Sequence, residues 1–171
     1  VDKLHAAVHK VIADRIEAAS YAIAAAITRG KIEIVDAPLN IMAAVAHVLT
    51  DIGVTITETE NGFVSDASDA YLIGTDVMTE PYPGFPTDVQ AQLTALLTTV
   101  SGASLITESI FENRFMHVGE LQRMGASIQV EGRTASIRGV PFLRGAFVRA
   151  TDLRAGAALT LAGLAAHGQT E

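Results

Sequence analysis

Two stretches, Thr28-Arg-Gly-Lys-Ile-Glu-Ile34 and Val100-Ser-Gly-Ala-Ser-Leu-Ile106, decide the fold of this chain because they repeat one pattern. In each stretch a helix end is followed by a glycine and then by an apolar strand. The two glycines, Gly30 and Gly102, are 72 residues apart. Self-similarity at a fixed distance is typical of a chain that is built from repeated supersecondary units.

A second pair of stretches has the same spacing. His47-Val-Leu-Thr-Asp-Ile-Gly53 matches Leu121-Gln-Arg-Met-Gly125, and the closing glycines are again 72 residues apart. Each stretch is followed by a segment of alternating apolar and polar residues, then by a glycine turn and a further strand, which is the pattern of a β-hairpin. The alternating segments are Val54–Glu58 and Ser127–Glu131. Each unit therefore reads helix, strand, helix, strand, strand.

A third unit opens near Thr151. Gly168 follows Asp152 by 16 residues, and Gly30 follows Asp14 by the same distance. The sequence thus predicts an α/β fold with two full units and part of a third, within a single domain fragment. The predicted boundaries are about residues 1–70 for unit one, about 76–140 for unit two and about 141–171 for the partial unit three.

Composition excludes several classes of protein. The 171 residues are 49% hydrophobic, which supplies a core, and carry a formal net charge of −7, which argues against a nucleic-acid partner. No apolar run reaches the roughly 18 residues of a membrane helix, so we expect no membrane partner. The absence of cysteine excludes disulfides and thiolate metal sites. Only His5 and His9 have ligand-like spacing, without a third ligand, so no metal site is predicted.

The two ends of the sequence indicate a fragment. The chain opens at Val1 without a methionine, and His167–Glu171 reads as a helix end followed by the start of a strand. A domain seldom ends where a strand begins. We therefore expect this chain to be a piece of a longer polypeptide.

The first helix of each unit starts beside an aspartate, which favours helix capping as the simplest interpretation. Asp14, with Glu17 three residues on, resembles a capping box, and Thr87 with Gln90 has the same pattern. The three aspartates are Asp14, Asp88 and Asp152.

Arginines in the first turn of two of these helices weaken a purely structural interpretation. Arg15 and Arg154 follow their aspartates closely, and a cation there opposes the helix dipole. If the units pack around a pseudo-symmetry axis, the helix starts converge and can bind a phosphate or carboxylate together with these arginines. An aspartate in the same place suggests the handling of a proton or a hydroxyl. The pattern indicates an anionic substrate and acid–base chemistry.

Longer strings carry a family resemblance. Pro83-Gly-Phe-Pro-Thr-Asp-Val-Gln-Ala-Gln92 and Ile106-Thr-Glu-Ser-Ile-Phe-Glu-Asn-Arg-Phe-Met-His-Val118 closely resemble the UDP-N-acetylglucosamine enolpyruvyl transferases. The resemblance continues at Glu120–Ala126 and Ala150–Leu159, with a weaker match at Val11–Glu17. It covers essentially the whole chain, and the strings are far more specific than a short glycine motif.

The resemblance implies an activity for the complete protein: transfer of the enolpyruvyl group from phosphoenolpyruvate to the 3-hydroxyl of UDP-N-acetylglucosamine, with release of phosphate. In that family this is the first committed step of peptidoglycan synthesis in the cytoplasm, and it needs no cofactor. The implied fold has two domains, each an inside-out α/β barrel of three βαβαββ units, with the substrates closed between them.

This chain resembles most of the C-terminal domain of that family. The N-terminal domain of the same protein would be its partner. That domain would supply the lysine, the arginines and the cysteine-bearing loop that engage phosphoenolpyruvate. We therefore expect the chain to carry the acceptor-sugar half of the site and to be inactive alone.

The resemblance also assigns roles to five residues. Asp88 matches the aspartate that contacts the sugar hydroxyl and is proposed to take its proton, which makes it the candidate catalytic residue. Ile110 matches a position whose backbone contacts the nucleotide sugar. Polar residues that line the interdomain cleft match Arg114, Asp152 and Arg154.

Each assignment has a structural alternative. Asp88 could merely strengthen a helix start, and Arg114 could form a surface ion pair with Glu112 or Glu120. Ile110 is of a type that is ordinarily found in the core.

Two other functions compete with the transferase. One is a non-catalytic repeat module that binds a nucleotide sugar or a partner protein. The other is a relative of the enolpyruvyl shikimate-phosphate synthases, which share the fold; the Phe-Pro-Thr-Asp and Phe-Glu-Asn-Arg-Phe strings disfavour it.

Overall fold

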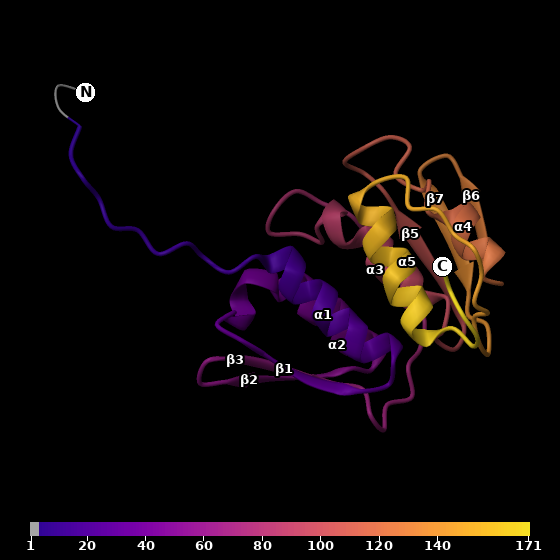
Figure 1. Ribbon diagram of the computed structural model, residues 1–171, viewed down its shortest axis with the longest axis horizontal. Coiled ribbons are helices and arrows are strands. Elements are labelled where there is room, and N and C mark those ends of the chain that lie inside the picture. The colour runs from indigo at the N-terminus through magenta and orange to yellow at the C-terminus, as the bar shows by residue number, and fades with distance from the viewer. Residues whose placement is uncertain (1–3) are drawn as a thin grey trace.

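The computed structural model describes residues 4–171, and the first part of the chain folds into a three-stranded antiparallel sheet covered by helices (Figure 1). The strand order is β1-β3-β2. Helix α1 packs against β1 and β3, which buries the alanines and isoleucines of its inner face. The elements are α1 (Arg15–Ile27), β1 (Lys31–Val35), a 3₁₀ turn (Leu39–Met42), α2 (Ala43–Ile52), β2 (Thr55–Thr59) and β3 (Gly62–Asp66).

The second part of the chain forms a four-stranded sheet in the order β4-β5-β7-β6. The short strand β4 runs parallel to β5, and the other pairs are antiparallel. The elements are β4 (Val77–Met78), the 3₁₀ turn η2 (Thr87–Val89), α3 (Gln90–Leu97), β5 (Ala103–Thr107), α4 (Val118–Arg123), β6 (Ser127–Glu131) and β7 (Thr134–Arg138).

The predicted repeat is present in these strands residue for residue. β1, β2 and β3 lie 72 positions before β5, β6 and β7, and each set has the same pairing. The backbone N–H of Val54 donates to the carbonyl of Leu49 at 2.9 Å. The equivalent bond joins Ala126 to Leu121 at 3.0 Å. The predicted fold class of repeated α/β units is confirmed.

The two units differ in one respect, since residues 4–14 form no strand before α1 in the way that β4 precedes α3. The strands of residues 4–171 form two open sheets and no closed barrel.

The third unit begins with α5 (Leu153–Ala165). Beyond this helix, His167 forms a parallel bridge with Arg144, and the backbone N–H of Val148 donates to the carbonyl of Glu171 at 2.8 Å. This parallel pairing on either side of a helix resembles that of β4 with β5.

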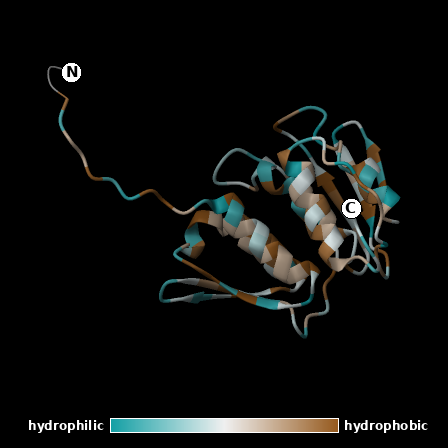
Figure 2. Cartoon of the chain, viewed as in Figure 1, coloured by the Kyte–Doolittle hydropathy of each residue, from teal (hydrophilic) through white to brown (hydrophobic). Residues whose placement is uncertain are grey.

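Helices α1, α3 and α5 pack side by side in the centre of the molecule (Figure 1). All eight residues of α3 are buried, and α1 and α5 are largely white to brown on the hydropathy scale (Figure 2). Gln92 of α3 donates from Nε2 to Oγ of Ser20 in α1 at 3.2 Å, and these two residues are themselves 72 positions apart. The equivalent helices of units one and two therefore face each other directly.

The starts of these helices follow the capping prediction in two cases of three. Asp14 and Asp152 cap α1 and α5, each accepting two backbone N–H groups of the first turn at 2.7–3.4 Å. The predicted capping box of Thr87 with Gln90 is wrong, because the Thr87 hydroxyl donates instead to Glu108 and no side chain caps α3. The chain enters α3 through the 3₁₀ turn η2.

One predicted helix-ending glycine is also placed differently. Arg29, rather than Gly30, takes the left-handed conformation after α1, with φ of 55°. The Arg29 guanidinium donates to the carbonyls of Ala26 and Thr99, at 3.3 and 2.8 Å, which holds the left-handed residue in place. The other three have positive φ as expected: Gly53, Gly102 and Gly125.

Within residues 4–171, no helix combines the length and the apolar character that crossing a bilayer requires.

A buried histidine precedes α4. His117 is 3% exposed, and its Nε2 atom has no hydrogen-bond partner within residues 4–171. Burial lowers the pKa of the imidazole to about 4, although the nearby Asp152 carboxylate acts in the opposite direction. The folded protein therefore keeps His117 neutral at pH values where the unfolded chain binds a proton.

This difference predicts acid sensitivity of the fold. Because the unfolded state takes up the proton below about pH 6.5, stability is fully present above that pH and decreases as the pH falls toward 4. We expect His117 to contribute a loss of about 2 to 3 kcal/mol in unfolding free energy between pH 7 and pH 4.5. Denaturant unfolding at both pH values should show that His117→Gln loses less stability on acidification than the parent chain. The exposed control, His47→Gln, should follow the parent; equal pH slopes for all three proteins would contradict this.

Candidate functional site

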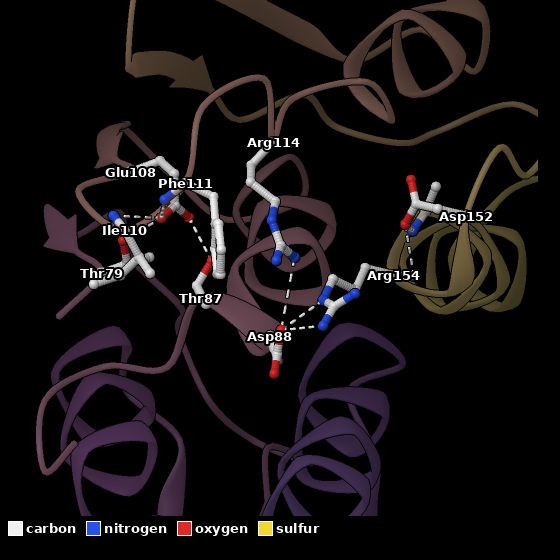
Figure 3. A network of polar contacts seen from close by, with 10 residues as sticks. Thr79, Thr87, Asp88, Glu108, Ile110, Phe111, Arg114, Asp152 and Arg154 are labelled. Atoms are coloured by element: carbon white, nitrogen blue, oxygen red, sulfur yellow. Dashed lines mark hydrogen bonds and ion pairs between the residues drawn. The ribbon is translucent and has the colours of Figure 1, made fainter. Parts of the chain in front are cut away.

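Asp88 lies at the centre of a cluster of polar side chains that come from three elements (Figure 3). The 3₁₀ turn η2 presents it just before α3, with its side chain 39% exposed. Its Oδ1 atom accepts from Nε of Arg154 at 2.6 Å and also from Nη2 of the same residue. Nη1 of Arg114 lies 3.6 Å from the same oxygen. Oδ2 has no partner among residues 4–171, so it is free to accept a proton or hydrogen bond from a ligand.

Each of the two arginines also contacts another residue, which helps to fix its position beside Asp88. Arg154 belongs to the first turn of α5, and its backbone N–H donates to Asp152 at 2.9 Å. Arg114 lies in the loop after β5, with its guanidinium 4.4 Å from the centre of the Phe111 ring. Both side chains are partly buried, which strengthens their electrostatic effect on the carboxylate compared with a surface pair.

The surface alternative for Arg114 is not what the structure shows. Of its two candidate partners, Glu112 pairs instead with Arg133 at 3.0 Å. Glu120 pairs with Arg123 at 3.5 Å. Arg114 pairs with Asp88 instead of with either glutamate.

Arg15 does not join this cluster. Its guanidinium lies 5.1 Å from the centre of the Tyr82 ring, in the loop that leads to η2. Of the two first-turn arginines expected to converge at the helix starts, only Arg154 reaches Asp88, because a cation–π contact directs the side chain of Arg15 toward the loop.

Asp152 has a structural role that Asp88 lacks. Its carboxylate accepts the backbone N–H groups of Ala155 and Arg154, at 3.0 and 2.9 Å. These bonds, that of Ala155 first, keep the pKa of Asp152 below its usual value. The charge at the start of α5 is therefore fixed, and it orients the turn that carries Arg154.

Two cavities adjoin the cluster. One, of about 290 Å³, is lined by Arg114, Asp152 and Arg154 together with the buried His117. The other, of about 480 Å³, lies between the three central helices and is lined by Asp88 and Arg154 with residues of α1. The structure thus brings four of the five candidate residues together, and the three helix starts converge as their spacing predicted.

Ile110 lies apart from both cavity linings. Its backbone N–H donates to Oε1 of Glu108 at 2.9 Å, so that group is already occupied. The carbonyl oxygen of Ile110 is therefore the backbone group that remains for a contact with a ligand.

The sequence analysis missed Glu108, which is the most heavily bonded carboxylate near the site. It is 1% exposed and accepts four hydrogen bonds, which Figure 3 shows beside the Asp88 cluster. Its place directly after the apolar strand that the repeat predicts is the signal that could have found it. A carboxylate buried there needs several donors from the fold.

Metal ligation has no support in the described part of the chain. Residues 4–171 bring together no group of three or more His, Asp or Glu side chains that could hold a metal ion. The charges at the site are those of carboxylates and arginines, which suits recognition of an anion and a hydroxyl.

Comparison with known proteins agrees with this geometry. The EPSP synthase (3-phosphoshikimate 1-carboxyvinyltransferase) family profile matches residues 1–171. The chain is 58% identical over 170 residues to a UDP-N-acetylglucosamine 1-carboxyvinyltransferase of Paramagnetospirillum magneticum, covering 99% of this chain and 39% of that protein. It is 56% identical to the protein of that name in Gluconobacter oxydans, covering 100% and 41%.

Solved structures show the same fold. The enolpyruvyl transferase NikO from Streptomyces tendae superposes with a TM-score of 0.79 at 26% identity, covering 91% of this chain and 37% of that one. EPSP synthase from Acinetobacter baumannii gives 0.67 at 22% identity, covering 95% and 39%. The chain spans about 40% of the length of the curated relatives it matches. Sequence, fold and site together establish that this chain belongs to the EPSP synthase family.

Proposed function

We propose that this chain provides the acceptor half of a carboxyvinyl transferase, which moves the enolpyruvyl group of phosphoenolpyruvate to the 3-hydroxyl of UDP-N-acetylglucosamine. The observation that carries the proposal is the state of Asp88: one carboxylate oxygen is bonded to arginine, and the other has no partner among the residues that the structure describes, 4–171. The relatives that are 50–58% identical are named for this reaction, which supports the choice of acceptor.

The cluster can perform one defined part of the chemistry. The acceptor hydroxyl is too weak an acid to react unaided, so a base must meet its proton as the new C–O bond forms. In this proposal Oδ2 of Asp88 takes that proton, while Arg154 and Arg114 hold the carboxylate in position through Oδ1. The groups that bind phosphoenolpyruvate and release phosphate belong, in this proposal, to the N-terminal domain. The product would enter peptidoglycan synthesis in the cytoplasm.

The same site allows a second acceptor class within the family, a shikimate phosphate. The family profile carries that enzyme's name, although the similar EPSP synthase structure is only 22% identical. Phosphate release by the full-length protein with each acceptor in turn separates the two. Release with UDP-N-acetylglucosamine and not with shikimate 3-phosphate supports the proposal; the reverse would overturn it.

One prediction of the proposed function concerns the isolated chain. Purified alone, the 171 residues should release no phosphate from phosphoenolpyruvate and UDP-N-acetylglucosamine, because positioning both substrates supplies much of the rate acceleration. The full-length protein, assayed in parallel, is the control. Turnover by the isolated chain would show that the chemistry has been assigned to the wrong half.

A further prediction of the proposed function concerns Asp88 in the full-length protein. Asp88→Asn keeps the shape but removes the base, so kcat should fall by about 10²–10⁴, the usual scale for a general base. The melting temperature should change little, because the side chain is partly exposed and caps no helix. Steady-state kinetics and thermal melting measure the two effects.

The matched control is Asp69→Asn, which changes an exposed aspartate outside the cluster and should retain full activity. A fall in kcat of less than about tenfold for Asp88→Asn would reduce Asp88 to a binding residue. Loss of activity together with a large fall in melting temperature would favour a structural role.

A further inference from the structure

Glu108 connects two segments that the candidate site needs at a fixed separation. One is the 3₁₀ turn η2, which carries Asp88; the other is the loop after β5, which carries Ile110 and Arg114. The two segments are about 20 residues apart in sequence, and neither belongs to a regular helix or sheet that would set its position.

The carboxylate of Glu108 bonds to both segments at once. Its Oε2 accepts the hydroxyl of Thr87, the residue before Asp88, at 2.9 Å. Its Oε1 accepts the backbone N–H groups of Ile110 and Phe111, at 2.9 and 3.1 Å. Both oxygens are therefore in use, and every partner is a donor, as an acceptor-only carboxylate requires.

A third anchor ties this arrangement to the sheet. Thr79, which is fully buried at the end of β4, donates its hydroxyl to Oε1 of Glu108 at 2.8 Å. The same hydroxyl accepts the backbone N–H of Ser109 at 2.9 Å, and the Ser109 hydroxyl donates to the carbonyl of Thr79. The loop is thus bonded to β4 on both sides of Glu108, so the carboxylate itself has a rigid base.

Within residues 4–171, no cation neutralises the charge of the Glu108 carboxylate. Among residues 4–171 no lysine, arginine or histidine nitrogen lies within 4.0 Å of a Glu108 oxygen as an ion pair. A buried carboxylate without a cation is costly unless hydrogen bonds replace its hydration. A neutral residue of the same size would fill the core as well, but it could not accept four hydrogen bonds.

We propose that Glu108 is a positioning residue of the transferase: its carboxylate fixes the Asp88 turn relative to the loop that carries Ile110 and Arg114. The proposal rests on the proposed function. Glu108 touches no substrate and acts through Thr87 and through the Ile110 backbone. Because a displacement of about 1 Å in a reacting group can reduce a rate about 10²-fold, such a connection affects catalysis without taking part in it.

The test uses the full-length enzyme with Glu108→Gln, Thr87→Val, Thr87→Ser and the double variant Glu108→Gln/Thr87→Val. Glutamine can keep an oxygen at the Oε1 position, but its NH₂ group takes the place of Oε2, so the Thr87 hydroxyl must change from donor to acceptor. The charge-assisted bond to the Asp88 turn is then replaced by a weaker neutral one. Thr87→Val removes the connection to the Asp88 turn alone, and Thr87→Ser restores it. The matched control is Glu131→Gln, at an exposed glutamate that ends strand β6.

We expect Glu108→Gln to lower kcat/KM for UDP-N-acetylglucosamine by about 10- to 100-fold. The KM for phosphoenolpyruvate should stay within about twofold, because the misplaced groups face the acceptor. Thr87→Val should lose activity in the same direction, and Thr87→Ser and Glu131→Gln should match the wild type. The double variant should be no worse than Glu108→Gln, because both changes break one connection.

Three results would overturn the proposal: wild-type kinetics for a folded Glu108→Gln enzyme, additive losses in the double variant, or equal increases in the KM of both substrates. If Glu108→Gln does not fold, the Thr87 pair decides, and equal activity of Thr87→Val and Thr87→Ser overturns it. A wild-type enzyme that does not act on UDP-N-acetylglucosamine would instead refute the proposed function.

Discussion

The complete burial of helix α3 is the constraint on which the rest of the structure depends. All eight of its residues are buried, and its polar side chains bond inside the protein, except that Oε1 of Gln92 has no partner within residues 4–171. Thr94 donates to the carbonyl of Gln90, and Gln92 donates to Ser20 of the neighbouring helix α1. These bonds and the apolar contacts with α1 and α5 fix the axis of α3. Because Asp88 lies in the 3₁₀ turn that leads directly into this helix, the packing of α3 fixes the position of the site.

The site combines a rigid frame with a carboxylate oxygen, Oδ2 of Asp88, that has no partner within residues 4–171. Arg154 and Arg114 reach Asp88 from two further elements and both approach a single oxygen, while Glu108 holds the neighbouring turn and loop through four hydrogen bonds. The free oxygen of Asp88 is therefore the one acceptor of that carboxylate left for a ligand. A preorganised carboxylate of this kind suits proton transfer from a hydroxyl, since little reorganisation is needed at the moment of reaction.

The unit repeat explains why these residues meet. Equivalent helices of units one and two face each other through Ser20 and Gln92, and α5 of the third unit packs beside them. Pseudo-symmetry places the three helix starts at equivalent positions in their units, but the residues and contacts at these starts differ. Two aspartates cap their helices, but the position 72 residues after Asp14 is Pro86, which precedes the 3₁₀ turn η2. Asp88 lies inside that turn, and its carboxylate pairs with Arg154 and Arg114 instead of capping. A carboxylate that does not cap its helix thus lies at the start of the central helix of the three.

The sequence by itself determined the repeated α/β fold, the helix starts at Asp14 and Asp152, and the family, because hydrophobic periodicity and glycine turns act locally and long strings are specific. It also indicated that Asp88 and Arg154 meet. Only the tertiary structure decided that Arg114 joins them while Arg15 turns to Tyr82, since competing partners within a few residues cannot be ranked from spacing. The role of Glu108 could not be predicted from spacing for a related reason. Its donors come from residues 79, 87, 110 and 111, and only the folded chain brings those segments together.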